Sequence, residues 1–275
     1  MNDHIGMLAD GGVTLLGCGK MGGAMLEGWL EAGLPTAAVT VIDPAGSDRL
    51  RALETEGLIL NPQAVRSSAV CVLSVKPQMM AAALPSVAGL AAQGTLFLSV
   101  AAGLPLRYFE QALGPDARVV RAMPNTPSAV GRGITALIGN AGVDEVGMAL
   151  VEALTGAIGA TLRLDDESQM DAVTGVSGSG PAYVFHMIEA MAAAGVAQGL
   201  PEGVAMQLAR ATVCGAGELA HRSPEDAAQL RVNVTSPGGT TAAALAVLMA
   251  EGAGLTELMT RAVAAAADRS RELGR

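Results

Sequence analysis

The sequence predicts an α/β domain followed by an all-α domain, on three observations. Short apolar runs alternate with helical patterns over the first 165 residues. A glycine-rich turn, Gly17–Gly22, joins the first apolar run to the first helical pattern. Beyond residue 165 the strand patterns stop, and Ala, Met, Leu and Gly dominate, with polar residues at helical spacing. Strands that alternate with helices are typical of a parallel sheet with right-handed crossovers. We therefore expect two domains, 1–165 and 166–275.

Eight apolar stretches of the first domain are expected to be strands. Ala69–Val75 is a continuous apolar run, as in a strand that is buried on both faces. Val13–Leu16 is shorter and stops at a glycine. The expected strands, in chain order, are 13–16, 39–42, 58–60, 69–75, 96–100, 119–122, 134–138 and 161–164.

Helical periodicity fills the segments between several strands and all of the second domain. Met21–Ala32 ends at Gly33, and Ser47 is suited to cap a helix over Ser47–Glu56. A third helix is expected over 143–158. The helices expected in the second domain are 166–174, 181–198, 201–221, 224–232, 240–251 and 255–273.

Composition excludes several classes of protein. The chain has 275 residues, 51% of them hydrophobic, and a net charge of −9, which argues against a partner with a phosphate backbone or an anionic membrane. Three cysteines without a C-x-x-C and three scattered histidines indicate neither a disulfide framework nor a metal site. The N-terminus lacks the features of a signal peptide. We expect a cytoplasmic protein that binds no metal, nucleic acid or membrane.

The turn Gly17-Cys18-Gly19-Lys20-Met21-Gly22 has the pattern G-x-G-x-x-G between a strand and a helix. In this context the first glycine makes the tight turn, the second lets backbone approach a pyrophosphate, and the third lets helix and strand pack closely. The helix N-terminus then meets the phosphate charge with free N–H groups. The sequence thus predicts a Rossmann-like domain that binds NADPH or NADH.

Asp43 ends the second expected strand, 21 residues after Gly22. An acidic residue at this place usually bonds the ribose hydroxyls of NAD and repels a 2′-phosphate. Ser47 and Arg49 follow closely and are suited to bind that phosphate instead. Asp43-Pro44 also reads as an ordinary turn. Asp43 favours NAD, and the alternatives stay open at this point.

Two further loops follow expected strands, and ligands of open parallel sheets bind at that edge. One contains Val75, Lys76 and Pro77, and the other contains Ala101 and Ala102. Their small residues would let a nicotinamide ribose come close, although both also read as plain strand-to-helix turns.

Three longer motifs follow, namely Arg121-Ala-Met-Pro-Asn-Thr-Pro127, Ser177-Gly-Ser-Gly-Pro-Ala-Tyr183 and Val234-Thr-Ser-Pro-Gly-Gly-Thr-Thr241. With GCGKMG and SVKP before them, nearly the whole chain resembles the pyrroline-5-carboxylate reductases. The resemblance implies a helical second domain that forms a homodimer, a substrate site at the dimer interface, and in some relatives a ring of dimers. It also implies reduction of Δ1-pyrroline-5-carboxylate to L-proline by hydride from NAD(P)H, the last step of proline biosynthesis.

The resemblance assigns residues to the site. Gly17–Gly22 match its pyrophosphate loop, and Asn61 matches an asparagine that contacts the cofactor. Thr240 and Thr241 match the positions that hold the substrate. With Asp43, the expected cofactor residues are Gly17, Cys18, Gly19, Lys20, Met21, Gly22, Asp43, Asn61, Val75, Lys76, Pro77, Ala101, Ala102, Met123, Pro124 and Asn125. The expected substrate residues are Ser177, Gly178, Ser236, Gly238, Gly239, Thr240 and Thr241.

The residues themselves indicate how these motifs would act. Gly238–Thr241 precede an Ala-rich helix, whose N-terminal amides are suited to a carboxylate. Thr241 can place its hydroxyl near the ring nitrogen of an imine, which makes it the expected catalytic residue. Thr240 also reads as a helix cap, and Ser177 and Gly178 read equally well as a structural turn.

Two other functions remain in competition. A β-hydroxyacid dehydrogenase on the same plan normally uses a lysine of its second domain, whereas the two lysines here, Lys20 and Lys76, both lie in the first domain. A catalytically silent cofactor-binding regulator would need no Gly-Gly-Thr-Thr loop, and this chain has one at 238–241.

Overall fold

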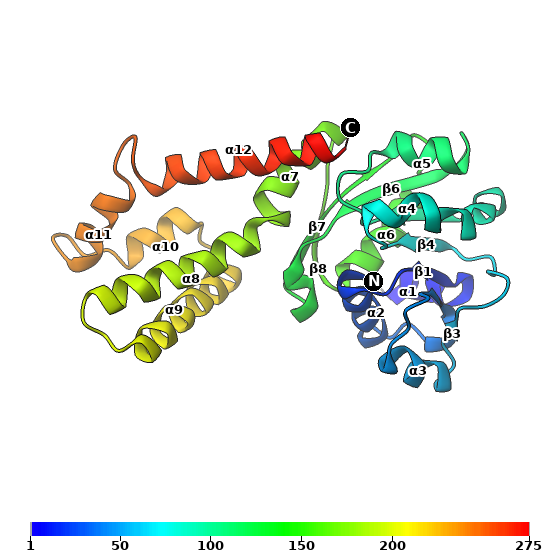
Figure 1. Ribbon diagram of the computed structural model, residues 1–275, viewed down its shortest axis with the longest axis horizontal. Coiled ribbons are helices and arrows are strands. Elements are labelled where there is room, and N and C mark those ends of the chain that lie inside the picture. The colour runs from blue at the N-terminus through cyan, green and yellow to red at the C-terminus, as the bar shows by residue number, and fades with distance from the viewer. Residues whose placement is uncertain (1, 275) are drawn as a thin grey trace. The chain divides into compact units, whose positions relative to one another are not determined.

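The computed structural model describes residues 2–274, which form two compact units (Figure 1). One unit runs up to Gly178 and includes the residues from Ala267 onward, and the other is Ser179–Ala266. The α/β fold followed by helices is the expected fold class. The assignment of residues 166–275 to dimerisation and substrate binding stays a prediction.

The first unit is built on one eight-stranded sheet with the order β3-β2-β1-β4-β5-β6-β7-β8. Neighbouring strands are parallel except β6 and β7, which are antiparallel. The strands are β1 Val13–Leu16, β2 Val39–Ile42, β3 Ile59–Leu60, β4 Val70–Leu73, β5 Leu96–Ser99, β6 Arg118–Met123, β7 Gly133–Gly139 and β8 Gly159–Arg163.

The register of four adjacent strands, β2, β1, β4 and β5, brings their carboxyl ends to one level. Leu16 at the end of β1 pairs with Ile42 of β2 and with Leu73 of β4. Leu73 in turn pairs with Ser99 of β5. The loops that follow β1, β2, β4 and β5 therefore leave the sheet at the same edge, which is where open parallel sheets bind ligands.

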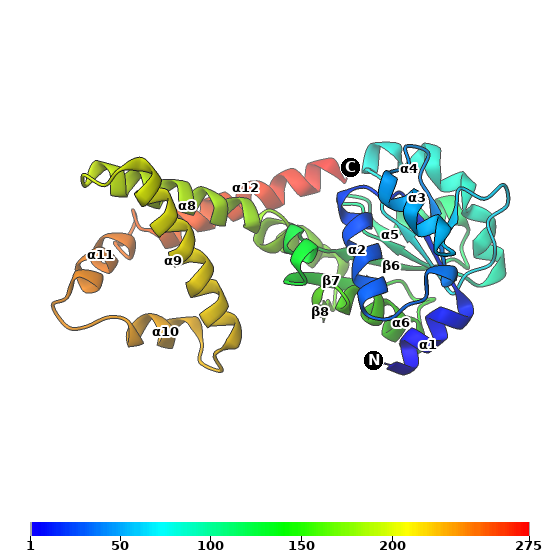
Figure 2. The same cartoon turned by 90° about the horizontal axis from the view of Figure 1, so that it is seen from below.

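Apolar side chains bury both faces of this sheet. In β5, Leu96 and Leu98 join one buried cluster and Phe97 joins the other, as the two-residue period of a strand requires. Trp29, fully buried in the first cluster, donates from Nε1 to the Leu154 carbonyl oxygen at 2.9 Å. Helices cover these faces, as Figure 2 shows from below. They are α1 Asn2–Gly11, α2 Lys20–Glu31, α3 Asp48–Thr55, α4 Pro77–Ala83, α5 Leu106–Leu113 and α6 Glu145–Gly156, with short 3-10 turns that include η4 Thr126–Val130.

The helix expected over 166–174 is in fact three short pieces. A 3-10 turn, η5 Glu167–Gln169, leads into α7 Met170–Val173, and a π-helical turn, η6 Thr174–Gly178, follows. Asp166 caps the first piece, because its side chain accepts from Ser168 N at 2.7 Å. Single π-turns are frequent at functional sites, and this one contains Ser177.

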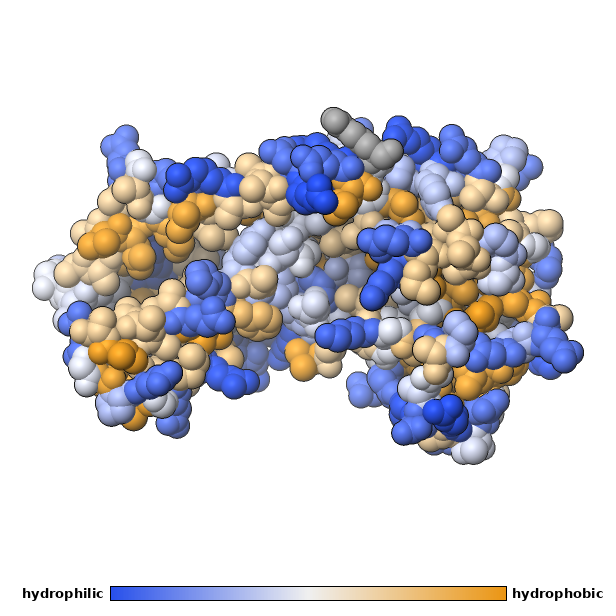
Figure 3. Space-filling model, in the orientation of Figure 1, coloured by the Kyte–Doolittle hydropathy of each residue, from blue (hydrophilic) through white to orange (hydrophobic). Residues whose placement is uncertain are grey.

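The second unit is entirely helical. Its helices are α8 Gly180–Ala197, α9 Glu202–Arg222, α10 Ala227–Asn233, α11 Thr240–Leu248 and most of α12 Leu255–Leu273. Helices α8 and α9 pack through small residues, namely Ala192, Ala205 and Ala209. Much apolar surface stays exposed on this unit, including Phe185 at 61% and Val247 at 72% (Figure 3). Within the described residues, no helix is long and apolar enough to cross a membrane.

Candidate active site

The glycine-rich turn after β1 has the local geometry that a bound pyrophosphate needs. Gly17 has φ +87°, and a Cβ there would lie 2.7 Å from Cγ1 of Val75. A Cβ on Gly22 would lie 2.5 Å from the carbonyl oxygen of Gly17. A Cβ on Gly19 would meet nothing within 4 Å. The first and third glycines are therefore required by packing, whereas Gly19 opens onto free space where a ligand can approach the backbone.

Backbone donors line that open space. Helix α2 begins at Lys20, and its first intrahelical bond runs from Gly23 N to Gly19 O at 2.8 Å. The amides of Lys20, Met21 and Gly22 thus precede the helical hydrogen-bond pattern, as at any helix start. Together with the positive end of the helix dipole, they fit the pyrophosphate of a dinucleotide.

The carboxylate of Asp43 accepts from two backbone amides, and one of them, that of Cys18, belongs to this turn. Its Oδ2 accepts from Cys18 N at 2.7 Å, and its Oδ1 accepts from Ala45 N at 2.9 Å. Asn61 binds the backbone of Asp43 on both sides, with Asp43 N donating to its Oδ1 and its Nδ2 donating to Asp43 O, each at 2.9 Å. The structure therefore brings together three of the expected cofactor residues at the ends of β1, β2 and β3.

Burial and the charges of Asp43 and Glu27 raise the pKa of the Cys18 thiol to about 11. Cys18 is half-buried and stays a neutral thiol at physiological pH. Among residues 2–274, no group of three His, Cys, Asp or Glu side chains could hold a metal ion.

The β4 loop lies beside the glycine-rich turn, and the β5 loop lies beside the end of β4. Ser74 donates from Oγ to the carbonyl oxygen of Gly17 at 2.6 Å, which ties the β4 loop to the β1 loop. Lys76 is exposed and precedes α4, whose first residue is Pro77. The β5 loop begins with Val100, whose N donates to Leu73 O at 3.1 Å. Ala101 is buried and Ala102 is exposed in that loop.

Two motifs whose contacting residues are 52 positions apart in sequence meet in the first unit. Asn125, 9% exposed, donates from Nδ2 to the carbonyl oxygen of Ser177 at 3.3 Å and accepts from Ile134 N at 3.0 Å through Oδ1. A Cβ on Gly178 would lie 2.5 Å from Cε of Met123. The structure therefore places expected cofactor residues of the β6 loop against expected substrate residues of the π-helical turn.

The remaining expected substrate residues form a separate group in the second unit. Gly238 has φ +70°, and Gly239 N donates to Ser236 O at 3.0 Å, which closes a tight turn before α11. Gly239 is the N-cap residue, so Thr240 is the first residue of the helix rather than its cap. Thr241, partly buried, follows it. The amides of this first turn are oriented to receive a carboxylate.

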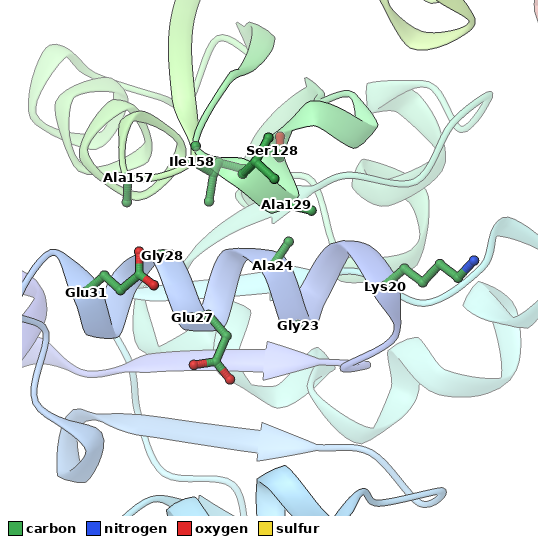
Figure 4. A pocket seen from close by; sticks show the side chains of 12 residues that line it. Lys20, Gly23, Ala24, Glu27, Gly28, Glu31, Ser128, Ala129, Ala157 and Ile158 are labelled. Carbon is green, nitrogen blue, oxygen red and sulfur yellow. The ribbon is translucent and has the colours of Figure 1, made fainter. Parts of the chain in front are cut away.

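A cavity of about 450 Å³ lies beside α2. Its walls come from α2, from η4 with the following glycine, and from Ala157 and Ile158 (Figure 4). Of the expected cofactor residues only Lys20 borders it. The cavity thus runs along the flank of α2 and stands apart from the Asp43 end of the cofactor turn.

Sequence reasoning did not identify two acidic residues near these loops. Glu27 of α2 pairs with Arg49 of α3, with Nε–Oε1 and Nη2–Oε2 distances of 2.8 Å each. Glu167 accepts from Leu106 N at 2.8 Å and from Arg121 Nη1 at 2.9 Å. The partners of the two ion pairs lie 22 and 46 residues apart in sequence. No local sequence pattern predicts contacts at such separations.

Two families match this chain. Residues 167–273 match the family described as pyrroline-5-carboxylate reductase dimerisation. Residues 12–103, which contain the glycine-rich turn, Asp43 and Asn61, match the family described as NADP oxidoreductase coenzyme F420-dependent.

Full-length relatives carry the first of these names. The chain is 39% identical over 264 residues to a pyrroline-5-carboxylate reductase of Pseudomonas aeruginosa, covering 95% of this chain and 96% of the relative. It is 42% identical over 265 residues to one of Synechocystis, covering 95% and 97%.

Solved structures agree with the sequence relatives. A pyrroline-5-carboxylate reductase of Coxiella burnetii superposes with a TM-score of 0.88 at 34% identity, covering 96% of this chain and 99% of that one. The enzyme of Plasmodium falciparum, solved with NADP bound, gives 0.78 at 27% identity, covering 96% and 98%. Matches of this extent in sequence and in fold place the chain in the pyrroline-5-carboxylate reductase family.

Proposed function

We propose that this chain is an oxidoreductase that reduces Δ1-pyrroline-5-carboxylate to L-proline, the last step of proline biosynthesis. The observation that carries the proposal is the match of 39–42% identity over 95% of the chain to reductases of that name. NADH or NADPH, when bound, supplies the hydride that is added to the carbon of the C=N bond. The chain's own residues bind and orient the two reactants.

On the cofactor side, the proposal uses the open space over Gly19 and the amides of Lys20, Met21 and Gly22. These donors neutralise the pyrophosphate locally, which matters because the whole chain has a net charge of −9 and does not attract anions by its overall field. The proposal assigns the nicotinamide end of the cofactor to the loops after β4, β5 and β6. The residues concerned are Val75, Lys76, Pro77, Ala101, Ala102, Met123, Pro124 and Asn125.

On the substrate side, the proposal assigns the carboxylate to the first-turn amides of α11, next to Gly238, Gly239 and Thr240. Thr241 orients the imine by a hydrogen bond between its hydroxyl and the ring nitrogen. The proposal also assigns Ser177, Gly178 and Ser236 to substrate binding. Holding the C=N carbon in register with the hydride donor is the main source of rate enhancement in such a reaction.

The match to a reductase dimerisation family indicates a homo-oligomer. The exposed apolar side chains of the second unit support it, since large exposed apolar patches mark interaction surfaces. We propose a dimer that completes the substrate site, with a ring of dimers as its higher assembly, in the cytoplasm.

In the experiment that tests this proposal, purified protein is mixed with Δ1-pyrroline-5-carboxylate and either NADH or NADPH. Loss of the reduced nicotinamide absorbance, with formation of one L-proline per cofactor oxidised, is the expected result. No turnover with either cofactor, from protein that is folded and binds the cofactor, would refute the proposal. A small 3-hydroxy acid tested with NAD or NADP distinguishes the hydroxyacid dehydrogenase alternative.

A further inference from the structure

The loop that follows β2, beside the glycine-rich turn, carries the features that bear on the choice between the two nicotinamide cofactors. We infer that this chain selects NADH over NADPH, with Asp43 as the residue that recognises the ribose, Asn61 as its positioning residue, and Glu27 as the residue that holds Arg49 away from a phosphate. The inference rests on the proposed function only for the class of cofactor. Its test requires no imine reduction.

The carboxylate of Asp43 is fixed in direction. Oδ2 is bound to Cys18 N at 2.7 Å and Oδ1 to Ala45 N at 2.9 Å, so each oxygen has a backbone donor that prevents rotation about the last side-chain bond. An oxygen at the end of the second strand, next to the glycine-rich turn, stands where a ribose hydroxyl can donate to it. A 2′-phosphate offers no such donor and brings negative charge to the same place.

Asn61 holds the backbone beneath that carboxylate. Its side-chain amide takes both backbone groups of Asp43, with two distances of 2.9 Å, in the way a neighbouring strand would. Asn61 has φ +46°, and no other non-glycine residue among those described has a positive φ. Its own N donates to Val41 O at 2.8 Å, continuing the pairing of β2 and β3. Because its amide faces Asp43, Asn61 acts on the cofactor through Asp43.

The two cations that follow Asp43 along the chain are neutralised by internal partners. Glu27 binds Arg49 through two parallel hydrogen bonds of 2.8 Å, and this bond lowers the pKa of Glu27. Figure 4 shows the Glu27 carboxylate turned away from Ser128 and Ile158. Arg51 bonds to Asp48 at 3.2 Å. A 2′-phosphate would therefore have to break an ion pair to gain a guanidinium from this segment.

One cation of the adjoining loop, Arg66, could give the opposite result, a preference for NADPH. Arg66 is exposed and lies five residues after Asn61, on the connection from β3 to β4. If Arg66 binds a 2′-phosphate, the chain should bind NADPH at least as tightly as NADH. Arg66→Met should then weaken the binding of NADPH and leave the binding of NADH unchanged. That result overturns the inference.

The experiment measures dissociation constants for NADH and NADPH with the full chain, from the change in nicotinamide fluorescence on binding and without the imine. We expect NADH to bind at least about tenfold more tightly than NADPH. Asp43→Ser should reduce the ratio of NADH affinity to NADPH affinity to about one or below. Glu27→Gln should strengthen NADPH binding by roughly three- to tenfold and leave NADH binding unchanged, because Arg49 is released towards the phosphate.

Two controls separate this effect from a general loss of structure. Glu152→Gln removes a carboxylate that accepts two hydrogen bonds from Arg163, at 2.7 and 3.0 Å, elsewhere in the first unit, and it should change neither constant. Asn61→Ala should lower the NADH-to-NADPH ratio while the thermal transition stays cooperative. Equal affinity of the unaltered chain for both cofactors would overturn the inference. So would a ratio of NADH to NADPH affinity that is the same in Glu27→Gln as in Glu152→Gln. Because no turnover is measured, this outcome is independent of whether the imine is the substrate.

Discussion

Asn125 donates a hydrogen bond from Nδ2 to the carbonyl oxygen of Ser177, over 3.3 Å. Through its Oδ1 the same side chain accepts from Ile134 N. One buried amide thus joins the end of β6, the start of β7 and the π-helical turn Thr174–Gly178. If the cofactor and substrate loops lie as proposed, Asn125 determines the distance between them.

Asn125→Ala should lower turnover and reduce the free energy of unfolding by about 1–3 kcal/mol, because Ile134 N loses its acceptor in a buried place. Asn125→Asp is the matched variant, since it keeps an acceptor for Ile134 N and removes the donor to Ser177. Denaturant unfolding and steady-state kinetics measure the two effects. Wild-type turnover in Asn125→Asp would show that the bond to Ser177 has no part in activity.

Gly19 and Gly22 belong to one motif but should respond differently to the same substitution. Gly22→Ala places a Cβ 2.5 Å from Gly17 O, so backbone must move, and we expect a loss of about 1–3 kcal/mol in stability. Gly19→Ala meets nothing within 4 Å and has φ −72°, so the fold should be unaffected. Cofactor affinity should fall in both variants. A Gly19→Ala variant that binds cofactor normally would contradict our placement of the pyrophosphate.

Much of the fold could be predicted because its signals are local. The buried strands are continuous apolar runs, and the expected strand 96–100 is β5 with one residue fewer. Ser47 caps α3 as expected, accepting from Leu50 N at 3.1 Å. The glycine-rich turn is itself a local pattern, so most of the cofactor loops could be located from sequence.

Direction and tertiary contact are harder to predict from sequence. Periodicity does not encode strand direction, so the antiparallel pairing of β6 with β7 was missed, although the connection 124–132 is too short for the dozen or more residues that a parallel crossover needs. Helix α1, Asn2–Gly11, was not predicted either. Its Leu8 is fully buried in the first cluster, a tertiary contact that the short N-terminal sequence does not reveal.

Glu167 should be important for stability because Arg121 depends on it. The Arg121 side chain is 8% exposed, and Glu167, at 30%, is its partner at 2.9 Å. Glu167→Ala leaves a buried guanidinium without its carboxylate, and we expect a loss of about 2–4 kcal/mol, since breaking a buried pair from one side is costly. Glu167→Gln keeps an acceptor for Leu106 N and should lose less. Equal stability of Glu167→Ala and wild type in denaturant unfolding would mean that water replaces the carboxylate fully.

Cys18 should resist alkylation despite lying in an open loop. Thiolate is the reactive form, and burial together with the charges of Asp43 and Glu27 raises the pKa of this thiol to about 11. The rate of iodoacetamide modification at Cys18 should therefore be low at neutral pH and rise as the pH approaches 11. Peptide mapping by mass spectrometry follows each cysteine separately, and denatured protein provides the unshifted control. Rapid modification of folded protein at pH 7 would contradict the raised pKa.

Thr241 provides the sharpest test of the substrate side. Thr241→Val keeps the shape and removes the hydroxyl, so turnover should fall by roughly ten- to a thousand-fold, which corresponds to about 1.4–4 kcal/mol in the transition state. Cofactor affinity should not change, because the residue acts on the imine. Thr241→Ser restores a hydroxyl at the same place and should recover most of the rate, whereas Thr240→Val, one residue earlier, should chiefly raise KM. A Thr241→Val enzyme with unaltered kinetics would remove this hydroxyl from the reaction and leave the helix N-terminus as the only part of the loop that acts on the substrate.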